Sequence, residues 1–173
     1  MLFFHIILLV IVLKIDYNKS EELIIYLFNN QYNIKLNKED NLEKYLKKIF
    51  LKLKKYYGIN IEGYYEVNIY IDNKYGIILK LKQHDFDYYN YSSNQVDMKI
   101  KLFYKKFWFL VDSFEFNLNK YDVYKYKDSI YLYPKNKLTK RELAYLIENS
   151  IIIFENDEII NKAKKVNFNI VNN

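Results

Sequence analysis

The residues best suited to metal chemistry lie in one short stretch, His84-Asp85-Phe86-Asp87. One imidazole and two carboxylates fall between two predicted strands there, so a single loop could direct all three toward a cation. The only other histidine, His5, is distant in the sequence and sits in an apolar run. A solvated acidic loop is the simpler interpretation, and we expect no cofactor. The candidate metal ligands are His84, Asp85 and Asp87.

Known catalytic motifs are missing from the sequence. With 3 glycines and no cysteine, the chain has no glycine-rich phosphate loop, no thiolate metal site and no cysteine nucleophile. Acids such as Asp112 and Glu115 could form a carboxylate pair, but any protein of this size offers as much. We therefore expect a protein without catalytic residues.

Two lysines lie among aromatic residues from Phe103 to Phe109. Some β-sheets bind single-stranded nucleic acid with this combination of side chains. Further lysines share one face of a predicted helix, and a net charge of +6 would add weak attraction for anions. The candidate residues for nucleic acid or another anionic partner are Lys44, Lys48, Lys52, Lys55, Lys105, Lys106 and Trp108. The competing interpretation is a solvated helix face and a packed pair of strands.

Tyrosines and lysines alternate again from Tyr124 to Lys127, where a hairpin is predicted. An exposed hairpin of this kind would suit a protein partner. The candidate contact residues are Tyr124, Tyr126, Tyr131 and Tyr133. The composition of the chain is biased toward isoleucine, lysine, asparagine, tyrosine and phenylalanine, and all five have A/T-rich codons. Its 20 tyrosines are therefore typical of an AT-rich bacterial genome and do not by themselves indicate a function.

Four helices are predicted from caps and apolar spacing. The first follows the capping residues 18–21 and runs to about Asn29, and the second carries a long apolar stripe that begins after Asn37 and ends at Gly58. A capping box of Thr139 and Glu142 starts the third, flanked by Leu138 and Leu143 as a hydrophobic staple. The fourth is capped by Asn156 and is expected to continue through Lys165.

Strands are predicted where apolar residues alternate. Two hairpins are indicated, one of residues 64–72 with 77–81 and one of residues 123–126 with 130–133. Residues 96–102 form another strand, with 107–111 as the expected hairpin partner, and Ile151–Phe154 forms a short buried strand.

The apolar run from Leu2 to Leu13 is shorter than the ~20 residues that a membrane-spanning helix needs. Its β-branched residues favour a buried strand, and a short membrane anchor is the alternative. Together these elements predict one α+β domain over residues 1–166, with a flexible tail over 167–173. We expect a mainly antiparallel sheet of about six to eight strands and about four helices.

The order of the later elements offers one loose family resemblance. Residues 111–115, then 124–132, then 143–149 run collinearly with segments of the MecA-type adaptor proteins of Gram-positive bacteria, which the chain resembles in this respect. The resemblance implies an adaptor that binds other proteins. That family is acidic and has an acidic linker between two domains, whereas this chain is basic and has no such linker.

The sequence thus predicts a cytoplasmic, non-catalytic interaction or regulatory module whose partner is another protein. Nucleic-acid binding is the first alternative, and membrane attachment through the apolar run is the second. The salt dependence of binding distinguishes protein interaction from nucleic-acid binding, because binding to phosphates weakens steeply as the salt concentration rises.

Overall fold

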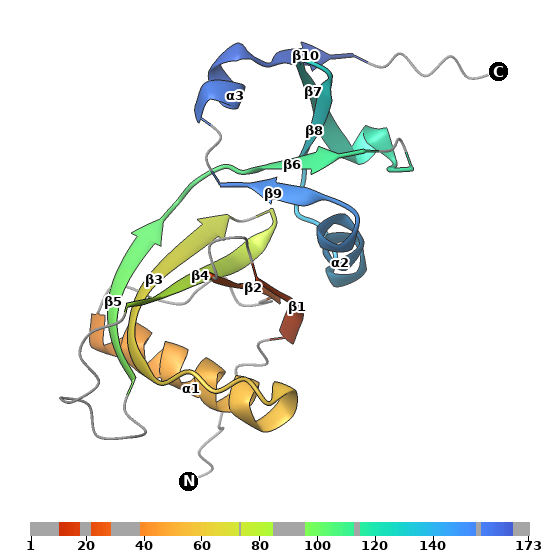
Figure 1. Cartoon of the computed structure of the whole chain (residues 1–173). Helices are drawn as coiled ribbons and strands as arrows, with labels where there is room; N and C mark the ends of the chain where they lie inside the picture. Colours follow the sequence, from red (N-terminus) through yellow and green to blue (C-terminus); the bar gives the residue numbers. More distant parts are fainter. Residues whose placement is uncertain are drawn as a thin grey trace, which may run out of the picture. The chain divides into compact units, whose positions relative to one another are not determined.

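Figure 1 shows a computed structural model of the chain, which describes residues 11–17, 22–28, 39–72, 74–84, 96–112, 115–154 and 157–167. The chain forms two compact units. The first comprises Met1–Ile71 and Gly76–Phe103, and the second comprises Asp72–Tyr75 and Tyr104–Asn173. The predicted α+β class is confirmed. The strands form two sheets of five rather than one sheet, and three α-helices occur in the described residues.

Two compact units can still fold as one domain, so the single domain over 1–166 stays a prediction. Of the predicted tail, 168–173 lie outside the described residues.

The first sheet has the strand order β1-β2-β4-β3-β5. Its strands are β1 (Ile11–Tyr17), β2 (Leu23–Phe28), β3 (Gly63–Asp72), β4 (Gly76–His84) and β5 (Val96–Phe103). β2 pairs antiparallel with β1 and β4, and a short turn joins the neighbours β3 and β4 as the predicted hairpin. β5 pairs parallel with β3, from Gly63 opposite Val96 to Tyr70 opposite Phe103.

The predicted first helix is wrong, because Leu23–Phe28 is the strand β2. All six residues are buried, so the segment has no solvated face of the kind an amphipathic helix needs. Isoleucine and tyrosine inside the run also favour a strand. The helical spacing involves only four members of an apolar run that is continuous from residue 23 to residue 28. The predicted capping residues 18–21 lie outside the described residues.

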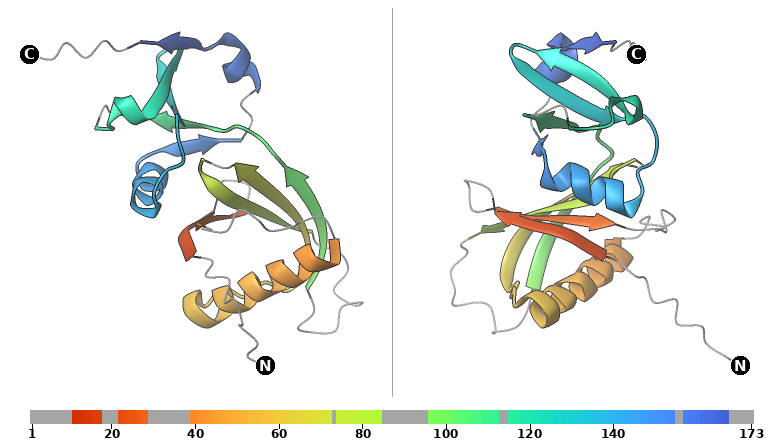
Figure 2. Two further views of the ribbon diagram at one scale, coloured as in Figure 1. Left: turned by 180° about the vertical axis from the view of Figure 1, so that it is seen from behind. Right: turned by 90° about the vertical axis from the view of Figure 1, so that its right-hand side faces the viewer.

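The predicted second helix is confirmed as α1 (Glu39–Tyr57), which crosses one face of the first sheet (Figures 1 and 2). Its stripe of Leu42, Leu46, Ile49, Phe50 and Leu53 is buried against the inward residues of β2, β3 and β4. Burying each such side chain stabilises the fold by about 1.5–3 kcal/mol. Gly58, with φ of +67°, ends the helix in a conformation that other residues adopt only with strain.

The second sheet has the strand order β10-β7-β8-β6-β9, and its neighbours pair antiparallel. Its strands are β6 (Trp108–Val111), β7 (Tyr121–Tyr126), β8 (Ser129–Pro134), β9 (Ile151–Ile153) and β10 (Lys164–Val166). The predicted β7–β8 hairpin is confirmed. A short strand is also found at β9, but only Ile152 of its three residues is buried, because Ile151 is exposed and Ile153 is half-buried. Residues 107–111 do not pair with β5, however. β6 pairs instead with β8 and β9, and residues 104–107 form no turn that would fold β6 back onto β5.

The capping box at Thr139 and Glu142 is confirmed at the start of α2 (Lys140–Glu148). Glu142 N donates to the Thr139 hydroxyl over 3.3 Å, and Thr139 N donates back to the Glu142 carboxylate over 2.8 Å. Leu138 and Leu143 are both buried beside it. A 3-10 turn, η2 (Leu118–Lys120), precedes β7.

The last helix is shorter than predicted. α3 covers only Asp157–Lys162, and residues 164–166 pair with β7 as β10. The open edge of β7 supplies backbone partners that a further helical turn would not use, so tertiary pairing overrides the local helical pattern.

The apolar N-terminal run is described only from Ile11, where β1 begins, and residues 2–10 lie outside the described part. In the part of the chain that the structure describes, no helix combines the length and apolarity needed to cross a membrane.

Two leucines of α1 provide a matched test of this core. Leu46 is fully buried, whereas Leu51 on the opposite side of the helix is 68% exposed. Leu46→Ala should lower the free energy of unfolding by about 2–5 kcal/mol, because it removes packed atoms and leaves a cavity. Leu51→Ala should change it by no more than about 0.5 kcal/mol. Urea titration followed by circular dichroism measures both, and similar losses would contradict the described orientation of α1.

Candidate functional site

Of the three predicted metal ligands, the described residues include only His84. Its Nε2 lies 3.8 Å from the Glu66 carboxylate, and its ring packs near that of Tyr64. Glu66 accepts a 2.9 Å hydrogen bond from Lys101, which holds the pKa of Glu66 below its usual value. Asp85 and Asp87 lie outside the described residues. No cluster of three acidic, histidine or cysteine side chains suited to a metal occurs among the residues described.

The candidate lysines of α1 form an exposed face on the first unit. Lys44, Lys48 and Lys55 are exposed and Lys52 is half-buried. Within the described residues none of the four forms an ion pair, whereas Lys47 and Lys54 on the same helix pair with Glu43 and Glu62. The four therefore form a separate cationic face, which we call the lysine face.

The other candidates for nucleic-acid binding belong to the second unit and are engaged within it. Trp108 is 2% exposed, and its ring stacks on Tyr124 with centroids 3.9 Å apart. Lys105 pairs with Asp157 over 3.1 Å. Lys106 Nζ lies 4.0 Å from the ring centre of Tyr133. A base cannot stack on the buried ring of Trp108, whereas Tyr104 of the same stretch is exposed.

Trp108 and the tyrosines of the β7–β8 hairpin meet on one face of the second sheet. Trp108 and the four candidate tyrosines form this surface, which we call the tyrosine face: Trp108, Tyr124, Tyr126, Tyr131 and Tyr133. Trp108, Tyr131 and Tyr133 are buried, and Tyr124 and Tyr126 are half-buried. The hairpin is thus confirmed, but its tyrosines are largely packed rather than displayed.

Polar groups at the rim of this face are tied to the tyrosines. The Tyr133 hydroxyl donates to Asp72 over 3.0 Å, and the Tyr126 hydroxyl donates to Glu158 over 2.8 Å. Burial, with the Asp72 carboxylate, raises the pKa of Tyr133. Burial also lowers the pKa of Lys106, and the nearby Lys74 ammonium adds to this effect.

The C-terminal elements cover part of the tyrosine face. Ile159 of α3 and Ala163 pack against its aromatic cluster. In Figures 1 and 2, α3 and α2 lie on opposite sides of the second sheet. The Nε1 of Trp108 is buried and has no hydrogen-bond acceptor among the described residues.

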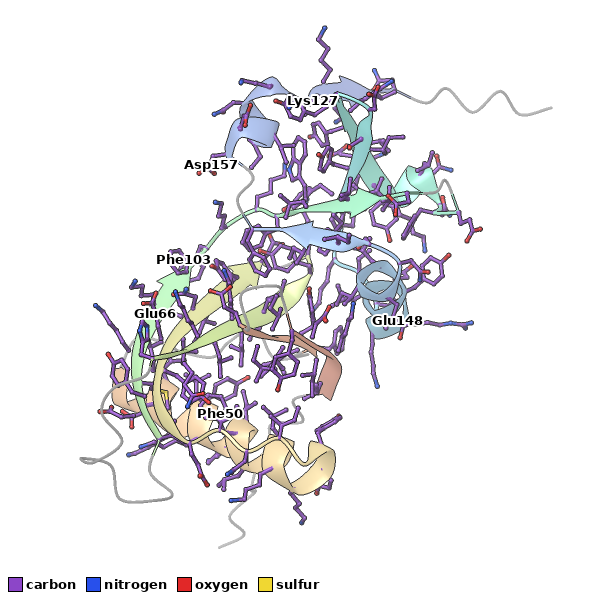
Figure 3. The ribbon with its side chains drawn as sticks, viewed as in Figure 1. Phe50, Glu66, Phe103, Lys127, Glu148 and Asp157 are labelled. Atoms are coloured by element: carbon purple, nitrogen blue, oxygen red, sulfur yellow. The ribbon has the colours of Figure 1, made fainter. Side chains whose placement is uncertain are left out.

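A groove lies in the first unit where α1 meets the start of β5. Its volume is about 630 Å³, within the range typical of binding sites. α1 supplies Phe50 and Leu51, the link to β3 supplies Ile61, and β5 supplies Val96 and Asp97. Figure 3 labels Phe50, a buried residue of α1 that lines it. The groove is mainly apolar and is rimmed by the Glu43–Lys47 and Lys54–Glu62 ion pairs.

A second cavity of about 470 Å³ lies between η2 and α2. Phe116 and Tyr145 line it edge to face, beside Arg141, which is the only arginine in the chain. Glu142 at its rim pairs with Lys120 and caps α2, and these interactions lower the pKa of Glu142 to about 2. Lys120 and Glu142 therefore neutralise each other.

Sequence analysis missed the α1–β5 groove. One signal was present, because Leu51 interrupts the polar side of a helix whose apolar stripe lies opposite. The other half, the edge position of β5, depends on its parallel pairing with β3, which no local pattern encodes.

These features define a mixed α+β protein with two five-stranded sheets, an open strand edge and an apolar groove beside it. In comparisons with known proteins, no family model, no curated protein and no solved structure matches the chain.

The paired Glu142 makes a prediction about pH. Its pKa in the folded protein, about 2, lies below the usual 4.5, so its interactions stabilise the fold above about pH 4.5 and are lost as the pH falls toward 2. The stability difference between the natural protein and Glu142→Gln should therefore shrink over that interval. Urea midpoints measured across the range test this, with Glu148→Gln as an exposed control on the same helix. A constant difference would show that the charge contributes nothing.

Proposed function

We propose that the protein is a non-catalytic interaction module whose first unit binds an extended segment of another protein along β5. The cytoplasmic location and the regulatory role expected from the sequence are part of this proposal. The single observation that carries it is the edge position of β5, beside an apolar groove.

The backbone of β5 supplies the first argument. This strand has eight residues, pairs with β3 on one side and has no partner on the other side among the described strands. An edge strand presents a row of N–H and C=O groups to which an extended chain can hydrogen-bond. β9 and β10, at the edges of the second sheet, have only three residues each and offer much less.

The side chains of β5 specify the chemistry of the partner. Val96, Met98, Ile100 and Leu102 are half-buried against the first core, so an added strand would continue their apolar face toward α1. Lys99 and Lys101 point to the other face, where Lys101 already pairs with Glu66. The complementary segment is therefore extended and amphipathic, with apolar residues on one face and acidic residues opposite Lys99.

The groove gives the partner an anchor. Both Phe50 and Leu51 line the groove, and Leu51 is exposed whereas Phe50 is buried. An apolar side chain of the partner could therefore contact both residues. Burying Leu51 under one large apolar side chain would contribute about 1.5–3 kcal/mol to binding.

The test begins with affinity capture from the native host by the tagged full-length chain. We expect Leu51→Asp and Lys99→Glu each to weaken binding of the captured partner by about tenfold or more, or ~1.4 kcal/mol. Lys82→Glu, the same charge change on an exposed residue of β4, should leave binding unchanged. Amide hydrogen exchange on the complex should show new protection in β5. A partner whose binding ignores Leu51 and Lys99 would refute this docking site.

The lysine face favours a second candidate function, because its four lysines lack ion pairs within the described residues while their helix neighbours are paired. A polyanion such as nucleic acid would bind there through its phosphates alone, and binding would weaken strongly with salt.

A matched pair of variants tests this candidate by fluorescence anisotropy with a labelled single-stranded oligonucleotide of mixed sequence. Lys44→Glu with Lys48→Glu should reduce binding at low salt much more than Lys47→Glu with Lys54→Glu, although both change the net charge equally. Equal losses would indicate only general attraction to a basic protein, and the absence of binding would remove the candidate.

A further inference from the structure

We propose that the C-terminal segment Asp157–Val166 is a displaceable cover over a second docking surface, formed by the tyrosine face and the edge of β7. The occupant that replaces this segment is an extended basic stretch of another protein. This inference concerns the second unit and goes beyond the function proposed for β5.

The covering segment is held by few interactions, most of them exposed. α3 has six residues, none of them buried, and β10 pairs with β7 through three residues. Lys105 pairs with Asp157, whose side chain is 81% exposed, and Glu158 accepts a hydrogen bond from Tyr126. Exposed ion pairs contribute little, and short elements with few buried residues open at low cost. Figure 3 labels Asp157 at the start of α3.

The tyrosine face beneath this segment is rich in large aromatic side chains. It carries a stacked Trp108–Tyr124 pair, together with Tyr131 and Tyr133. Large aromatic rings of this kind are the residues most often found at the energetic centre of protein interfaces. The buried Nε1 of Trp108 lacks an acceptor among the described residues, and a bound segment that supplied one would remove this cost.

β10 itself defines what the surface accepts. It lies antiparallel to β7, with Lys164, Lys165 and Val166 opposite Lys125, Tyr124 and Val123. Lys165 forms a 2.8 Å ion pair with Asp122. A competing segment must therefore be extended, carry a basic residue that reaches Asp122, and place small apolar side chains where Ile159 and Ala163 now lie.

The sequence allows the opening to be measured on the full-length protein. Trp108 is the only tryptophan, so tryptophan fluorescence reports on this face alone. The chain has no cysteine, so Lys125→Cys with Lys164→Cys can lock β10 to β7 through a single disulfide. Directly opposed residues in antiparallel strands are close enough for such a bond. The variant Ile159→Asp with Lys165→Glu removes one apolar contact and one ion pair and should release the cover.

We expect acrylamide to quench Trp108 least in the locked protein, more in the natural protein and most in the released variant, with a shift of emission to longer wavelength. Circular dichroism and urea unfolding establish that each variant is folded. If the released variant does not fold, Lys165→Ala alone replaces it, and amide exchange in β7 becomes the readout. Equal quenching and equal exchange in the locked and natural proteins would overturn the displaceable cover.

The docking surface is tested with a fluorescein-labelled peptide of residues 157–167 of this chain. It should bind the folded released variant at least about tenfold more tightly than the locked protein, because the lock keeps the site occupied. The same peptide with Lys165→Glu should bind the released variant more weakly than the natural peptide, because it cannot pair with Asp122. Absence of peptide binding to a folded, quenchable released variant would refute the docking surface while leaving the cover itself established.

Discussion

The need to pair backbone N–H and C=O groups along buried strands is the constraint on which the rest of this structure depends. It places β2, buried at all six residues, between β1 and β4, because only an interior position satisfies both of its edges. The same need brings β5 beside β3 in parallel. It also makes Lys164–Val166 pair with β7 as β10 instead of extending α3. Each sheet then has edges left over, and those edges are where this fold can accept another chain.

The tyrosine-rich composition adds a second constraint, because a buried tyrosine brings a hydroxyl that needs a partner. In the second unit, two of these hydroxyls have acceptors among the described residues. Tyr75 donates to the carbonyl of Lys105, and Tyr133 donates to Asp72. Burial also raises the pKa of Tyr121 to about 12, because the charged form would be costly there. In Tyr75 and Tyr133 the fold thus uses tyrosine as a core residue with a polar anchor.

Local sequence signals were sufficient to predict those elements whose conformation depends on their own residues. The stripe of α1, the capping box at Thr139 and Glu142, and the turn at Lys127, with φ of 52°, all lie where the sequence predicts them. The errors arose where a distant strand decides the outcome. β2 has helical spacing but takes its conformation from β1 and β4, and β6 pairs with β8 and β9 instead of its sequence neighbour β5. The candidate tyrosines were identified correctly as a hairpin, but their burial depends on α3 and Trp108, which no pattern within the hairpin encodes.

The two proposed docking surfaces differ in whether the chain itself occupies the strand edge. Along β5 the outward residues include Lys99 and Lys101, and charged side chains on an edge oppose pairing with a second copy of the same strand. An acidic segment from another protein would remove that repulsion, so the same lysines that prevent self-association favour a chosen partner. On β7 the chain instead occupies its own edge with β10, and Lys165 neutralises Asp122. An edge with no partner among the described strands would discriminate by charge. An occupied edge would discriminate by competition, since a partner must bind more tightly than the short segment it replaces.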